Sequence, residues 1–363
     1  MRRFLLFSLF LLILSTTFCQ TGIDQMKKTI DPEMNSQGVP DKADRNNNFY
    51  DNEETFVLAP VELEVYGEVE NPGKVDFSKI EKRSVIVKET RLKEDGSNAF
   101  VGAYRYDGYS LFDILNDRRL KKKNAEEFRP IIDVYVEIEN NKGEKVVLSW
   151  GEIYYPNCLH NIIIAIDVMR IVPSKTRDLW PLPVESKLVV GNDLITERNI
   201  ASPTKITVRS DPRSFVVNRE LNPLVSNEVK VFQGEKLVET MKEIPAGLQK
   251  ETLHTIFYGK GRGIHSTLPF TGVYLKDYLD KKVPFDHKNL QEGLVLLVGI
   301  DGYRSAYTFS EIMNRNDQAE VLIVPCPEEK DGGKFRIFPS CDFFSDRAVK
   351  ALSEIRFELI RNP

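Results

Sequence analysis

The strongest constraint on the fold of this 363-residue chain is that its second half repeats the order of segments in its first half. Residues 107–115 (DGYSLFDIL) recur as 271–279 (TGVYLKDYL), and in both copies apolar residues lie at i, i+3 and i+4. This spacing predicts one apolar stripe on a short helix. Residues 147–153 (VLSWGEI) then match 307–312 (YTFSEI), which predicts a strand leading into a polar turn. The shared order of these segments indicates a tandem duplication.

Later segments of the two copies also match. An apolar run follows each turn, at residues 162–166 and 321–324, and predicts a buried strand. An acidic residue, a basic residue and an isoleucine then recur 149 residues apart: Asp193, Arg198 and Ile206 in the first copy, and Asp342, Arg347 and Ile355 in the second. The recurring acid–base pair favours an ion pair that fixes a loop in each copy over a catalytic role.

The duplication predicts two tandem domains. The first copy begins at about Leu58, and a junction at residues 210–212 (SDP) separates it from the second. The expected domains are therefore residues 58–209 and 210–363. Each copy mixes strands with few short helices, which favours an α+β fold with mixed sheets over a parallel sheet built from βα units.

The first 19 residues have the composition of a signal peptide. Arg2 and Arg3 precede an apolar core at residues 4–14, which is about half the length that a bilayer-spanning helix needs. Residues 20–57 are polar and aperiodic, which predicts a disordered tether. The chain is thus expected to be exported to the periplasm or the cell exterior. The alternative ending of the signal is a lipid on Cys19, which would anchor the protein to a membrane.

Charge and cysteine content exclude several classes of protein. The 50 Lys+Arg and 54 Asp+Glu leave a net charge of −4, so the chain is not a nucleic-acid binder held by bulk positive charge. Four cysteines are too few for a disulfide-dense scaffold. Cys326 and Cys341 could form a disulfide or remain two buried thiols. The four histidines lack the spacing of a zinc site.

Several short segments, in this order, resemble the molybdopterin-binding domain of the sulfite oxidase family: residues 65–72, 100–103, 268–273, 301–304 and 350–357. The resemblance implies two tandem mixed-sheet α+β domains. In active members of the family it also implies a molybdenum bound to a pterin dithiolene and to one cysteine thiolate.

The expected thiolate is missing from both copies. Where the family places its cysteine, the first copy has residues 89–91 (ETR) and the second has residues 258–260 (YGK). Hydroxyl groups are harder ligands than a thiolate and stay mostly protonated at neutral pH. We therefore expect an exported binding or structural module without molybdenum catalysis. The alternatives are an oxidoreductase that holds molybdopterin in its second domain and a surface adhesin.

The candidate binding site is the loop at residues 258–266 (YGKGRGIHS). Its three glycines allow close approach of the backbone to a ligand, and Lys260, Arg262 and His265 add positive donors. This composition can hold a phosphate or another anionic small molecule. If molybdopterin is bound, these three residues are expected to grip its phosphate. The alternative is a flexible, solvated basic hairpin loop.

Overall fold

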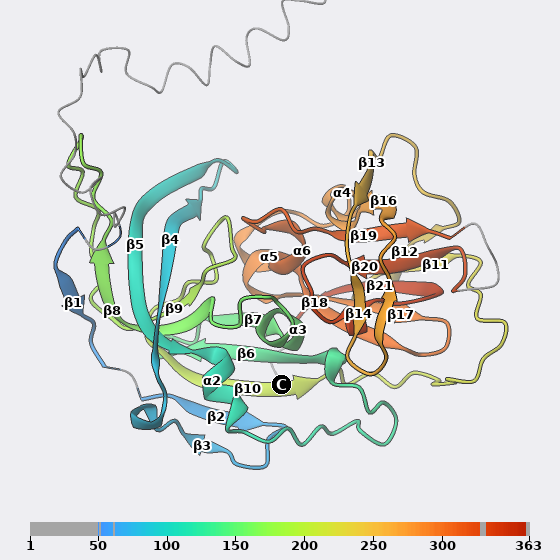
Figure 1. Ribbon diagram of the computed structural model, residues 1–363, viewed down its shortest axis with the longest axis horizontal. Coiled ribbons are helices and arrows are strands. Elements are labelled where there is room, and N and C mark those ends of the chain that lie inside the picture. Colours follow the sequence, from blue (N-terminus) through green and yellow to red (C-terminus); the bar gives the residue numbers. More distant parts are fainter. Residues whose placement is uncertain (1–49, 51, 61, 327–331, 361–363) are drawn as a thin grey trace, which may run out of the picture. The chain divides into compact units, whose positions relative to one another are not determined.

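The computed structural model describes residues 50, 52–60, 62–326 and 332–360 (Figure 1). The predicted signal peptide, its cleavage or lipidation at Cys19, and most of the predicted tether lie outside these residues. Within the predicted tether, Thr55–Val57 forms strand β1, which pairs antiparallel with β8. No helix in the described part of the chain combines the length and apolar character needed to cross a membrane.

The first copy forms two five-stranded sheets. One has the order β1-β8-β5-β4, with β9 also paired to β8; its further strands are β8 (Ile162–Arg170), β5 (Asn98–Ser110), β4 (Lys82–Leu92) and β9 (Lys187–Val190). The other has the order β3-β2-β10-β6-β7; its strands are β3 (Gly73–Lys74), β2 (Glu64–Gly67), β10 (Pro203–Ser210), β6 (Val134–Asn140) and β7 (Lys145–Ser149).

The second copy forms a five-stranded sheet, a four-stranded sheet and a hairpin. The five-stranded sheet has β12 (Lys236–Met241), β11 (Val229–Gln233), β21 (Leu352–Leu359), β17 (Gly293–Gly299) and β18 (Arg304–Thr308), in that order. The four-stranded sheet has β13 (Lys250–Leu253), β16 (Phe270–Tyr274), β19 (Val321–Pro325) and β20 (Phe335–Pro339). The hairpin joins β14 (Phe257–Gly259) to β15 (Gly263–Ser266).

The internal repeat is visible in the strand pairing. The path β2-β10-β6-β7 of the first copy has the same order and directions as β11-β21-β17-β18 of the second. In each copy the outer pair is parallel: Ile206 lies opposite Val65, and Ile355 opposite Val231. The buried strands predicted from the apolar runs are confirmed as β8 and β19.

The predicted α+β, sulfite-oxidase-like fold is wrong. The chain is mostly β, with 43% strand and 12% helix, and its small sheets adopt a four-blade, propeller-like arrangement. The physical reason is helix length, because a helix of five or six residues cannot form a layer that covers a sheet. The helices are α2 (Leu111–Asn116), α3 (Trp150–Tyr154), α4 (Leu275–Asp280), α5 (His287–Glu292) and α6 (Phe309–Met313), with short 3₁₀ turns at η3 (Phe77–Lys79), η4 (Ile131–Asp133) and η5 (Ser345–Arg347).

The two copies share part of their core. Each has an apolar cluster of its own, and a further buried cluster joins Tyr135 and Val147 of the first copy to Leu294, Leu296 and Ala306 of the second. These side chains come from β6 and β7 on one side and from β17 and β18 on the other. The described residues accordingly belong to one compact unit. The boundary between residues 209 and 210 stays a prediction.

Candidate functional site

The three basic residues predicted to bind an anion lie on the β14–β15 hairpin and are all exposed. The backbone N–H of Lys260 donates to Asp346 Oδ2 at 3.0 Å. The ring of His265 lies against Phe257, with centroids 5.5 Å apart. Neither of the two surface pockets described below is lined by Lys260, Arg262 or His265. Their role in binding stays a prediction.

Glu89 lies at the position where the sulfite oxidase family has its cysteine ligand. In this structure it forms a buried ion pair. Lys187 Nζ donates to both oxygens of Glu89, at 2.7 and 2.8 Å, and both residues are buried. The Tyr106 hydroxyl and the Asn199 amide also donate to Glu89, each at 3.2 Å. Burial lowers the pKa of Lys187, although the Glu89 carboxylate opposes that shift. This carboxylate already has its hydrogen bonds and packs as a structural group.

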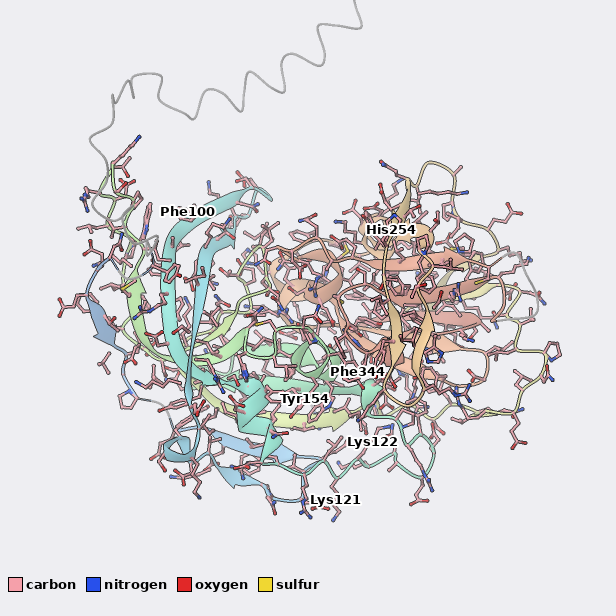
Figure 2. All side chains as sticks on the ribbon, viewed as in Figure 1. Phe100, Lys121, Lys122, Tyr154, His254 and Phe344 are labelled. Atoms are coloured by element: carbon pink, nitrogen blue, oxygen red, sulfur yellow. The ribbon has the colours of Figure 1, made fainter. Side chains whose placement is uncertain are left out.

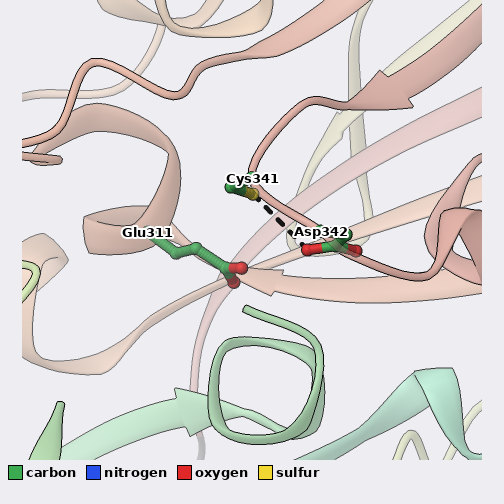
Figure 3. A group of neighbouring side chains, drawn as sticks. All are labelled: Glu311, Cys341 and Asp342. Atoms are coloured by element: carbon green, nitrogen blue, oxygen red, sulfur yellow. Dashed lines mark hydrogen bonds between the residues drawn. The ribbon is translucent and has the colours of Figure 1, made fainter. Parts of the chain in front are cut away.

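Glu311, Cys341 and Asp342 lie close enough together to resemble a metal site (Figure 3). However, a cation already occupies this position, because Arg347 Nη2 lies 2.5 Å from Glu311 and 2.6 Å from Asp342. Burial raises the pKa of the Cys341 thiol, and the neighbouring Asp342 carboxylate raises it further. The thiol instead donates to Asp342 at 3.4 Å. We therefore interpret the group as part of an arginine cluster.

The first copy contains the matching cluster around Arg198. This guanidinium donates to both oxygens of Asp193, at 2.8 and 2.6 Å, and to both oxygens of Glu152, at 3.0 and 2.9 Å. Arg347 likewise donates to both oxygens of Asp342, at 2.7 and 2.6 Å, but to only one oxygen of Glu311, at 2.5 Å. Both predicted ion pairs, Asp193–Arg198 and Asp342–Arg347, are thus confirmed. Each pair is joined by a glutamate, Glu152 or Glu311, that its sequence spacing did not predict.

These glutamates belong to two matching helix caps. Ser149 caps α3 and accepts from the Glu152 N–H, while the Glu152 carboxylate accepts from the Ser149 N–H. Thr308 and Glu311 form the same capping box at α6. The S/T-x-x-E pattern is present in both matched segments and could have identified the glutamates from the sequence. We call the two groups the twin clusters; their members are Ser149, Glu152, Asp193 and Arg198 in the first copy, and Thr308, Glu311, Asp342 and Arg347 in the second.

The twin clusters are bonded to each other across the two copies. The Ser149 hydroxyl donates to Glu311 Oε2 at 2.7 Å and accepts from Arg347 Nη1 at 3.1 Å. In the opposite direction, the Thr308 hydroxyl accepts from Arg198 Nη1 of the first copy at 3.1 Å. Gly151 is needed at this junction, because a Cβ at that position would collide with the Arg347 guanidinium. The clusters therefore hold the copies together.

A Ser–His–Asp group near α2 lacks the geometry of a catalytic triad. His160 Nδ1 lies 3.0 Å from Ser110 Oγ and 3.4 Å from Asp113, so one ring nitrogen faces both partners. In a triad the two nitrogens of the histidine face the serine and the acid separately. Ser110 is also fully buried, and its hydroxyl caps α2 by accepting from the Asp113 N–H. This group therefore serves as a helix cap.

The structure contains a pocket of about 480 Å³ lined by both copies, here called the inter-copy pocket. Its apolar lining comes from Tyr135, Leu294 and Ile360. Its charged lining residues come from several elements: Glu68, Lys123, Glu127, Glu137, Arg209, Asp211, Arg213, Glu235 and Glu358. Six of these are acidic and three are basic. Two arginines outside the lining pair with two of the acids, Arg304 with Glu127 at 3.0 Å and Arg356 with Glu235 at 3.9 Å. Six carboxylates thus face five cations, and the pocket keeps a small excess of negative charge.

Both arginines that line the inter-copy pocket are already paired with carboxylates. Arg209 lies 2.9 Å from Glu137, and the Arg213 guanidinium lies 2.5 Å from Asp211 and 3.1 Å from Glu358. Glu68, which is 5% exposed, accepts from the backbone N–H groups of Ser210 and Lys123 and from the Ser210 hydroxyl. Because these donors are uncharged, they leave the negative charge of Glu68 in place.

A second hollow, of about 770 Å³, lies on the outer side of β2 and β10. All its lining residues come from the first copy: Glu62, Glu64, Tyr66, Thr204, Lys205, Thr207 and Arg209. All of them are exposed or half-buried, whereas the inter-copy pocket is lined in part by buried side chains such as Glu68 and Asp211.

No model of a known protein family matches the chain, and no curated protein matches it. The inter-copy pocket and the β14–β15 hairpin are therefore the features of the structure that bear on its function.

Proposed function

We propose that this chain is a non-catalytic binding module, exported from the cytoplasm, that takes a small organic cation into the inter-copy pocket. The observation that carries the proposal is the acidic lining of this pocket, in which six carboxylates face three lining cations and two arginines outside the lining, Arg304 and Arg356. Its volume of about 480 Å³ lies within the range of small-molecule sites. The apolar lining residues would contact the carbon skeleton of such a ligand.

The buried reactive groups support a non-catalytic role. The carboxylates of Glu89, Glu152 and Glu311 each accept hydrogen bonds from a buried cation. A general acid or base must reach the proton that it transfers in the substrate. These groups are enclosed by their partners, whereas the inter-copy pocket opens to a ligand. Molybdopterin chemistry is not proposed, because the fold on which that alternative depended is not the observed one.

Spermidine is a suitable probe for this proposal, since it is a flexible organic polycation. We expect isothermal titration calorimetry to detect its binding to the chain, with affinity falling as salt is added. Glu358→Gln removes one half-buried carboxylate of the pocket and should weaken binding by up to about five-fold, because a partly exposed ion pair contributes about 0.2–1 kcal/mol.

Glu354→Gln is the matched control. It makes the same change on the same strand, at a residue that pairs with Arg356 and does not line the pocket. We expect it to bind spermidine like the parent chain. Equal weakening by both variants, or no binding by the parent chain, would contradict the proposed site.

A further inference from the structure

The β14–β15 hairpin lies in a segment with unusual charge. About one residue in seven of the whole chain is acidic, yet residues 252–276 contain no Asp or Glu. The same 25 residues contain three cationic side chains, Lys260, Arg262 and Lys276, together with His254 and His265. Lys276 is paired with Glu320 at 2.5 Å, so the cationic surface of this segment is formed by Lys260 and Arg262.

The hairpin and the residues on either side of it also expose large apolar side chains. Ile256 is 64% exposed, Ile264 66% and Leu268 72%. Phe343, which follows β20 in the chain, is 52% exposed and lies 5.9 Å from the Tyr258 ring. Several exposed apolar residues gathered on one short segment mark an interaction surface more often than isolated ones do.

An aromatic cluster of Tyr258, Phe343 and Phe344 joins the hairpin to the loop after β20. The Tyr258 ring contacts Phe343 and Phe344, and those two rings pack edge to face at 4.9 Å. Figure 2 shows Phe344 near the turn of the hairpin and His254 beside β13. The hairpin is therefore held against the body of the molecule at Tyr258 while its outer side chains remain in solvent.

The turn itself projects into open space. Lys260, Gly261 and Arg262 are all exposed, and a Cβ built on Gly261 would have no neighbour within 4 Å. Asp346 accepts from the backbone N–H of Lys260, and this bond does not use the ammonium group of Lys260. A projecting turn fits a flat partner better than it fits a ligand that must be enclosed.

We propose that the β14–β15 hairpin docks onto an anionic lipid surface. Lys260 and Arg262 would contact lipid phosphates, while Ile256, Ile264 and Leu268 enter the boundary between head groups and acyl chains. Cationic and apolar side chains interleaved on one element are typical of surfaces that bind in the membrane interface. This docking is independent of the inter-copy pocket.

Vesicle co-sedimentation tests the proposal with the full chain. We expect binding to vesicles of 70% phosphatidylcholine and 30% phosphatidylserine and much weaker binding to pure phosphatidylcholine. The double variant Lys260→Gln/Arg262→Gln should weaken binding to the anionic vesicles by about 30-fold, since each cation near the surface contributes about 1 kcal/mol. Ile264→Ser/Leu268→Ser should weaken binding to them at unchanged charge.

The matched control is Lys230→Gln/Lys236→Gln, which removes two exposed cations from β11 and β12 and should bind like the parent chain. Circular dichroism of each variant establishes that it is folded. Equal binding to both kinds of vesicle would overturn the proposal, as would equal losses from the hairpin and control variants. Retention of binding by Ile264→Ser/Leu268→Ser would also overturn it, because a purely electrostatic contact would then suffice.

Discussion

At the scale of single residues, the twin clusters contain more carboxylates than guanidinium groups. Asp193, Glu152, Glu311 and Asp342 face Arg198 and Arg347 in a buried site. Two uncompensated negative charges are costly away from water, so one carboxylate is expected to retain a proton. Burial and the neighbouring Glu311 carboxylate together raise the pKa of Glu152 to about 7, against the attraction of Arg198.

The raised pKa of Glu152 predicts a specific pH dependence of stability. Because the folded state holds this proton up to about pH 7 and the unfolded state releases it near its ordinary pKa of 4.5, stability should fall as pH rises through this window. Glu311 does not contribute there: burial alone would raise its pKa, but Arg347 and the Ser149 hydroxyl lower it below 4.5.

Glu152→Gln tests this prediction, because the amide cannot titrate. Urea unfolding at pH 5, 6 and 7 should show a smaller loss of stability with rising pH in this variant than in the parent chain. All other titratable groups are the same in the two proteins, so the difference between the two slopes reports on Glu152 and on the groups coupled to it. Parallel slopes would show that Glu152 is already ionised at pH 5.

At the scale of elements, two capped helices join the copies. The Ser149 cap of α3 bonds to Glu311 of α6, and the Thr308 cap of α6 bonds to Arg198 of the first copy. Each hydroxyl thus caps its own helix and also forms a hydrogen bond with the cluster of the other copy. Removing either one should therefore affect both helices.

A double-mutant cycle measures this coupling. Ser149→Ala and Thr308→Ala should each lower the free energy of unfolding by about 0.5–2 kcal/mol, as expected for a lost helix cap. Because the two hydroxyls belong to one network, the double variant should depart from additivity by at least about 0.5 kcal/mol. Ser110→Ala, at the separate cap of α2, should be additive with Ser149→Ala in unfolding titrations. Additivity in both pairs would place the hydroxyls in independent clusters.

The same elements show what the sequence could predict. The spacing at residues 111–115 and 275–279 located two helices, and the recurring acid–base spacing located both arginine pairs. These signals are local. The fold class was predicted wrongly because three apolar positions identify a helical turn but not the layer that covers a sheet. The bond from Ser149 to Glu311 spans 162 residues, and the inter-copy pocket gathers side chains from both copies, so neither has a local signal.

At the scale of the whole molecule, the two copies share a core cluster, the twin clusters and a pocket. Dividing the chain between residues 209 and 210 would expose Val147 and Leu296 to water and leave the Ser149 and Thr308 caps without their partners in the other copy. A binding site that needs both copies exists only while they remain docked. Cooperative folding of the copies and ligand binding are therefore linked properties.

Differential scanning calorimetry of the chain with and without spermidine tests this link most directly. A ligand that binds only the folded state raises the unfolding temperature. We expect a single transition whose calorimetric and van't Hoff enthalpies agree, and whose midpoint rises with spermidine concentration. Two separate transitions, of which spermidine moves one or neither, would contradict it.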